Sequence, residues 1–210
     1  MSKKEERRRY IKASARERFI ESGIELTTFA QIAKGAKVGE ATVYRHYSNK
    51  GELALEIAMD YGEGFVNAVT RRLEDHDGSH LQKLELILAY YIELFQEQPD
   101  YFIYLEHFDN YMMHNDLQPK GLETYEALFL GINKMICDIQ GGEVPDSSVR
   151  NDMNVDLAAH TFNISFLSLC QKLLLRGQVL HEDIRHNPIE ALVLLKETMI
   201  NSIKNPSFDG

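Results

Sequence analysis

The residues with the clearest chemical potential lie between Glu40 and Tyr47, in the stretch EATVYRHY. Val43 and Tyr47 are four residues apart, so a helix over this stretch has one apolar edge. Its polar edge carries two hydroxyls, a guanidinium and an imidazole, from Thr42, Tyr44, Arg45 and His46. Such groups hydrogen bond to phosphate oxygens and to base edges, so this edge is a candidate surface for contacting nucleic acid.

Two clusters of histidines and acids are weaker candidates for a metal site. The first comprises Asp75, His76, Asp77 and His80. Gly78 lies inside it and interrupts the helix that would place both imidazoles on one face. The second comprises His107, Asp109, His114 and Asp116, with no cysteine nearby. We therefore expect no bound metal and no other cofactor.

Motifs of the common enzyme classes are missing from the sequence. There is no Gly-x-Ser-x-Gly elbow, no phosphate loop with Gly-Lys-Ser/Thr, no Gly-x-Gly-x-x-Gly after a strand and no His-Glu-x-x-His. The two cysteines, Cys137 and Cys170, are interpreted as buried thiols of an intracellular chain. We expect a protein that is not an enzyme.

Three helices must position the polar edge, and they are predicted over residues 5–22, 28–36 and 40–47. Apolar residues recur every four positions in the first helix, at Ile11, Ala15 and Phe19. Gly23 ends that helix, and the hydroxyl of Thr28 is placed to cap the second. The second and third helices are thus joined by a tight turn.

That turn, at residues 37–39, is typical of a helix-turn-helix. Small and apolar side chains are available to pack in the corner between the two helices, at Ala33, Val38 and Val43. In a helix-turn-helix the second helix projects its polar edge into a groove of DNA.

A longer pattern of fixed spacing runs without a gap through this region. It comprises Ile11, Gly23, Thr27, Thr28, Ile32, Ala33, Ala36, Val38, Thr42, Val43, Tyr44, Tyr47, Lys50 and Leu53. The pattern resembles the N-terminal domain of the tetracycline repressor (TetR) family of bacterial transcription regulators. The resemblance implies a helix-turn-helix DNA-binding domain over residues 1–50 and a helical ligand-binding and dimerisation domain over 51–210. The helix at 51–75 would connect them.

The resemblance also implies roles for single residues. It places phosphate contacts at Thr28, Thr42, Tyr44, His46 and Lys50, and base-reading positions at Gly39, Glu40, Ala41 and Arg45, with Lys37 beside them in the turn. The guanidinium of Arg45 can pair with guanine, and Ala41 can touch a thymine methyl. The alternatives are a packed aromatic for Tyr44 and solvated charges for Arg45 and Lys50.

The sequence departs from the family pattern in and around the turn. Lys37 stands where Gly is usual, so it is expected to take a left-handed backbone at a cost of about 1 kcal/mol. Gly39 stands where Ser or Thr usually caps the recognition helix, and it gives a weaker cap. Two further departures are Ala41, where Gly is common, and Arg18, where an apolar residue is usual.

Charge is divided unevenly along the chain. Residues 1–50 hold twelve Lys or Arg and six Asp or Glu, whereas residues 51–210 hold eleven and twenty-six. A basic head followed by an acidic body fits DNA binding by the head, because attraction to phosphate depends on local charge. A solvated basic tail is the alternative. No apolar run is long enough to cross a membrane, and the N-terminus is not a secretory signal, so we expect a cytoplasmic location.

The acidic body is predicted to be helical throughout, which makes the fold class all-α. Helices are expected over 52–75, 81–98, 100–114, 121–139, 154–177 and 189–204. The last two carry more apolar surface than one core-facing side needs, through Leu157, Phe162, Phe166, Leu169, Leu173, Leu192, Leu195 and Met199. A homodimer through these helices would bring two heads to a palindromic operator, about 34 to 36 Å apart. A well-filled monomer core is the alternative.

Aromatic and histidine side chains in the body are candidates for lining a ligand cavity. They are Tyr104, His107, Phe108, Tyr111, Tyr125, Phe129, His160 and Phe162. Such a lining suits a mostly apolar or aromatic small molecule with a few polar atoms. An aromatic stripe at helical spacing is equally typical of a packed core.

The sequence hypothesis is therefore a homodimeric, ligand-responsive transcription regulator, usually a repressor, that a small molecule releases from its operator. One alternative is a helical enzyme or carrier of an apolar small molecule, whose basic head docks on a partner. Another is a DNA-binding structural protein without an inducer.

Overall fold

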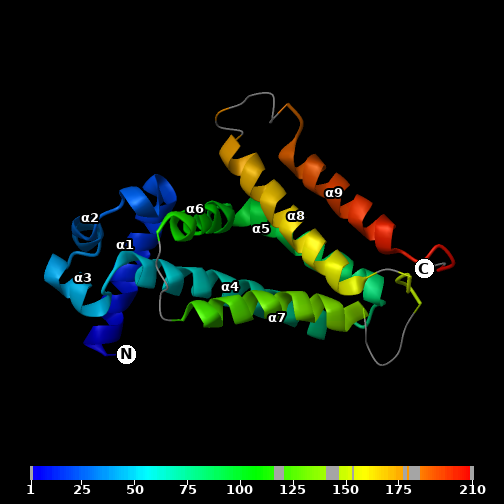
Figure 1. The fold of residues 1–210 in the computed structure, drawn as a ribbon, viewed down its shortest axis with the longest axis horizontal. Coiled ribbons are helices and arrows are strands. Elements are labelled where there is room, and N and C mark those ends of the chain that lie inside the picture. Colours follow the sequence, from blue (N-terminus) through cyan, green and yellow to red (C-terminus); the bar gives the residue numbers. More distant parts are fainter. Residues whose placement is uncertain are drawn as a thin grey trace. The chain divides into compact units, whose positions relative to one another are not determined.

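The fold is described from a computed structural model, which describes residues 2–115, 121–140, 147–152, 154–176, 179 and 185–208. Within these residues the chain forms nine α-helices and no strand, which confirms the all-α prediction (Figure 1). The helices are α1 (Lys3–Leu26), α2 (Phe29–Gly35), α3 (Glu40–His46), α4 (Lys50–Glu74), α5 (His80–Glu97), α6 (Asp100–His114), α7 (Leu122–Gln140), α8 (Val155–Leu175) and α9 (Pro188–Ile203).

Local signals fix most helix ends close to where the sequence predicts them. The hydroxyl of Thr28 accepts a hydrogen bond from the Gln31 amide (3.3 Å) and caps α2 as expected. At Gly23 the backbone leaves the helix with φ 77°, and a last turn to Leu26 follows. The expected helix end at residue 177 lies outside the described residues.

The chain divides into two compact units. The first comprises residues 1–63 and 103–127, and the second comprises residues 64–102 and 128–210. The limit at 63/64 falls inside α4, whose first turns form ion pairs with α1. Leu53, Ala54 and Ile57 are fully buried there.

The second unit is built around α5. This helix packs against both α8 and α9. The ring of Phe65 meets those of Tyr90, Tyr91 and Tyr101, with centroids 4.9 to 6.2 Å apart. Tyr91 in turn meets Phe166 at 5.4 Å. Among the helices so described, none is long and apolar enough to cross a membrane.

The turn between α2 and α3 is closed by two backbone hydrogen bonds. The Val38 amide donates to the Ala33 carbonyl (3.0 Å) and the Lys37 amide to the Lys34 carbonyl (3.2 Å), a Schellman motif. Lys37 has φ 54°, which confirms the left-handed backbone predicted for it. Ala33 and Val43 are buried in the corner and Val38 is half-buried.

Replacing Lys37 by glycine is expected to stabilise the protein by about 1 kcal/mol, because glycine takes a positive φ without the clash of a Cβ atom. Lys34→Gly is the matched control: it removes the same charge from a helical position and should destabilise by up to about 1 kcal/mol. Urea unfolding of both variants measures the two effects. Equal changes for the two would show that φ at Lys37 carries no strain.

Candidate nucleic-acid interface

The helix α3 buries its apolar edge and leaves its polar edge in solvent. Val43 is fully buried and Tyr47, the residue after the helix, is 3% exposed. On the other edge Tyr44 is 57% exposed, Arg45 is exposed and Thr42 is partly exposed. The structure therefore brings together the hydroxyls and guanidinium that the sequence places on one surface.

Two contacts orient this polar edge. The Tyr44 ring packs edge-on against buried Phe29 of α2, with centroids 4.9 Å apart. The Arg45 guanidinium donates to the Thr42 hydroxyl (2.9 Å) one turn before it. The Tyr44 ring thus packs on Phe29 and also remains open to solvent.

The N-terminus of α3 is open. Gly39 caps the helix with an extended backbone (φ −73°) and no side-chain hydrogen bond, as its lack of a side chain predicts. A Cβ atom placed on Gly39 would meet nothing within 4 Å. Glu40, Ala41 and Lys37 are exposed around it. A flat partner can therefore approach the backbone closely here.

Positive charge concentrates around the end of α3. Burial lowers the pKa of His46, and the nearby charges of Lys4, Arg8, Arg45 and Arg7 lower it further. The lowered pKa of this half-buried imidazole thus indicates that the local electrostatic potential is positive, which is the sign that attracts phosphate.

Thr28 and Lys50, two of the expected phosphate contacts, are engaged within the protein. The Thr28 hydroxyl also donates to Gln31 Oε1 (3.0 Å) within the capping box. Lys50 Nζ donates to the carbonyls of Ile24 (2.9 Å) and Glu25 (2.7 Å) and lies 5.7 Å from the centre of the Tyr111 ring. These two carbonyls occupy two of the three N–H donors of Lys50 and hold it against the protein.

An ion-pair network that the sequence expectations do not include positions α3. Glu56 of α4 accepts from the Arg8 guanidinium (2.7 Å) and from the Tyr47 hydroxyl (2.8 Å). One turn later Asp60 accepts from Lys12 (2.8 Å) and Arg16 (3.2 Å). The available signal is spacing: bases at 8, 12 and 16 and acids at 56 and 60 each recur every four residues.

The expected ligand-cavity residues are distributed over both units. The first unit contains Tyr104, His107, Phe108, Tyr111 and Tyr125. Tyr104 is fully buried, its hydroxyl donates to the Ala54 carbonyl (2.7 Å), and its ring stacks on Phe108. Phe108 also meets Tyr125 at 5.2 Å. These rings pack against one another as a core does.

The remaining expected cavity residues belong to the second unit. Phe162 is half-buried and His160 is exposed, and the side chain of Phe129 lies outside the described residues. Phe162 borders a small apolar gap of about 20 Å³ beside Tyr91 and Asn163, which share a short hydrogen bond. Over the described residues, no group of three or more His, Cys, Asp or Glu is gathered for a metal.

Comparison with known proteins identifies the N-terminal region. Residues 11–57 match the model of the bacterial regulatory proteins of the tetR family, which confirms the resemblance found in the sequence. No curated protein matches the chain significantly.

Solved structures share the fold of the whole chain. NalD, the secondary repressor of the MexAB-OprM multidrug efflux pump in Pseudomonas aeruginosa, has a TM-score of 0.72 at 21% identity, over 97% of this chain and 99% of NalD. The ketosteroid transcriptional regulator KstR2 of Mycobacterium tuberculosis has 0.69 at 16%, over 94% and 95%. FadR of Bacillus subtilis, solved with stearoyl-CoA, has 0.68 at 14%, over 93% and 98%.

Replacing Glu56 by glutamine is expected to destabilise the protein by about 1 kcal/mol at neutral pH. Burial alone would raise the pKa of Glu56, but hydrogen bonds from Arg8 and Tyr47 and the charge of Lys12 hold it below its ordinary value. The wild-type advantage is therefore complete above pH 4.5, the ordinary value, and disappears as the pH falls through the lowered one.

Unfolding free energies of wild type and Glu56→Gln across this acidic range measure the effect. Glu63→Gln, at an exposed position of the same helix, is the control and should stay within about 0.5 kcal/mol of wild type. A difference between wild type and Glu56→Gln that persists in acid would contradict the assigned ion pair.

Proposed function

We propose that this chain, whose residues 11–57 match the model of the tetR family of bacterial regulatory proteins, binds operator DNA through α3 and changes its affinity when a small molecule binds. The observation that carries the proposal is the exposed polar edge of α3, with its apolar edge buried beneath it. The fold shared with NalD, KstR2 and FadR supports it, since each of these is a regulator of transcription or a repressor. A cytoplasmic location follows from the proposed DNA target.

Residues 1–50 make the DNA-binding domain in this proposal, and their roles follow from chemistry and exposure. Tyr44, Thr42 and His46 contact phosphates and set the register of α3, because hydroxyls and imidazole do not demand a base identity. Arg45 reads a base: its guanidinium leaves the Thr42 hydroxyl and forms a bidentate pair with guanine. Gly39, Glu40 and Ala41 face the bases at the open N-terminus of α3, flanked by Lys37.

Binding to the DNA upstream of the protein's own gene tests the proposal. Fluorescence anisotropy should show a preference for this DNA over a shuffled sequence, and an affinity that falls steeply with salt as counterions are released. An affinity that ignores both sequence and salt would rule out specific DNA binding by this chain.

Two substitutions on α3 are expected to act differently. Tyr44→Ala should weaken binding to all DNA sequences alike, because it removes a phosphate contact. Arg45→Ala should relax the preference at one base pair, worth about 1 to 3 kcal/mol. Competition binding over single-base operator variants separates the two patterns, and the reverse pattern would overturn the two assignments.

We also propose a homodimer through α8 and α9. Of the apolar residues expected there, Phe166, Leu192 and Met199 face the core of the second unit and are buried. Leu157, also expected there, is 60% exposed. Two further residues of these helices, which the prediction does not include, are open to solvent as well: Ile164 is 49% exposed and Leu194 is 65% exposed. Leu157 and Ile164 are seven residues apart, so they lie on one face of α8. A second copy covering this face would place two α3 helices on one operator.

A chain with both Ile164→Glu and Leu194→Glu is expected to be monomeric, because burying unpaired carboxylates between two copies is costly. Light scattering should show half the wild-type mass. Met113→Glu is the matched control, since Met113 is 81% exposed on α6, and it should stay dimeric. A dimeric double variant would place the interface elsewhere.

The effector proposed for the body is a mostly apolar or aromatic small molecule. The aromatic residues of α5 and α6 support it, and so does the stearoyl-CoA bound by FadR of Bacillus subtilis. The family model and the similar solved structures are those of transcription regulators and not of enzymes.

A further inference from the structure

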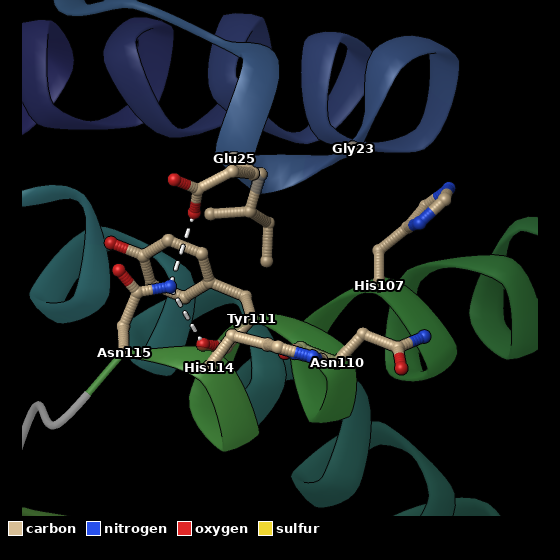
Figure 2. Close-up of a pocket in the computed structure, with 8 residues that line it drawn as sticks. Gly23, Glu25, His107, Asn110, Tyr111, His114 and Asn115 are labelled. Atoms are coloured by element: carbon tan, nitrogen blue, oxygen red, sulfur yellow. Dashed lines mark hydrogen bonds between the residues drawn. The ribbon is translucent and has the colours of Figure 1, made fainter.

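A cavity of about 450 Å³ lies in the first unit, between the end of α1 and the last turns of α6 (Figure 2). Residues 23–25 form one wall and residues between 107 and 115 form the other. A volume of this size accommodates a small organic molecule. Two of the residues expected to line a ligand cavity, His107 and Tyr111, border it.

The walls of the cavity are held by defined contacts. Gly23 turns the chain with φ 77°, and its carbonyl accepts from the Thr27 hydroxyl (2.8 Å). A side chain at this φ would be strained, so glycine is required. Asn115 uses both amide hydrogens on the facing walls, donating to Glu25 Oε2 (3.1 Å) and to the Tyr111 carbonyl (2.9 Å).

The polar groups around the cavity are mainly hydrogen-bond acceptors. His114 Nδ1 lies 2.7 Å from the Asn110 carbonyl, so Nδ1 carries a proton, and in this tautomer Nε2 is an acceptor. His107 spends one nitrogen on the Ile20 backbone, and burial lowers its pKa, which keeps its other nitrogen an acceptor at neutral pH. The exposed carboxylate of Glu25 adds a negative charge.

Apolar surface completes the site. Ile24 is 1% exposed and Tyr111 is 7% exposed, and both border the cavity. In Figure 2 the His107 ring points toward Gly23. The hydrogen-bond acceptors and the carboxylate of the site can bind N–H donors and a positive charge, and its apolar side chains can pack against a ring. A ligand that combines these features fits the site.

We propose that this cavity binds a small organic cation with N–H groups and an aromatic part, and that its occupancy holds Lys50 away from DNA. The second half rests on the proposed DNA-binding function. Lys50 provides the link: Ile24 and Glu25 hold its ammonium through their carbonyls, and Tyr111 lies against it. A ligand that favours this arrangement of the walls therefore opposes the release of Lys50 to a phosphate.

Calorimetric titration with tryptamine, in the absence of DNA, tests the site. Tryptamine should bind, whereas indole-3-acetate, with the same ring and a negative charge, should not. Glu25→Gln keeps an acceptor for Asn115 but removes the charge, and it should weaken tryptamine binding roughly fivefold. Glu21→Gln, an exposed carboxylate outside the cavity, is the matched control and should bind tryptamine as wild type does.

The proposal is overturned by any of three outcomes: absent tryptamine binding, equal binding of indole-3-acetate, or equal effects of the two Glu→Gln variants. Because these measurements contain no DNA, they stand whether or not the chain binds an operator. A His114→Ala variant provides a second probe of the same wall, and it should also weaken tryptamine binding.

The link to DNA is tested separately in the wild-type protein. Saturating tryptamine should weaken operator affinity by about fivefold or more. At a tryptamine concentration that saturates the variant, Lys50→Met should have about one unit less salt dependence in its DNA binding and show no tryptamine effect on that binding. A tryptamine effect that persists in Lys50→Met would disprove the role of Lys50, and failure of the wild type to bind DNA would instead disprove the proposed function.

Discussion

The carboxylate of Glu56 is the contact on which the position of α3 depends. Arg8 of α1 and Tyr47 at the end of α3 both donate to it, so three helices meet at one side chain of α4. A helix of seven residues has little stability of its own in water. Its orientation must therefore come from tertiary contacts, here this carboxylate at one end and the packing of Phe29 and Val43 along its length. Tyr44 and Arg45 face solvent as a consequence.

The same network changes how the charge of the head should be understood. Three of its twelve basic residues, Arg8, Lys12 and Arg16, are paired with Glu56 and Asp60 of α4. Counting all twelve as available to DNA therefore overstates the attraction. The pKa of His46, lowered by burial and then by Lys4, Arg8, Arg45 and Arg7, shows that the local field is still positive. Pairing to α4 thus fixes the geometry, while the remaining cations supply the field.

Sequence alone predicts the features that depend on neighbours in the chain. The caps at Thr28 and Gly39, the left-handed Lys37 and the two edges of α3 follow from local chemistry. Glu56 was missed because its partners are 9 and 48 residues away. Tyr104 shows a similar limit: its place in an aromatic stripe permits a cavity or a core, and only its bond to the Ala54 carbonyl favours the core. The cavity at Gly23 likewise needs two distant helices.

Lys50 illustrates how a small free-energy difference can make a contact switchable. Its ammonium is bound to two neutral carbonyls, and burial lowers its pKa, so its present position does not favour the charged form. A phosphate would give a stronger bond, because both partners would then be charged. The move would, however, remove the donor from the carbonyls of Ile24 and Glu25, and Ile24 is buried. Both the gain and the loss are on the order of 1 to 3 kcal/mol, so under this proposal a modest change in the walls that hold these carbonyls shifts where Lys50 binds.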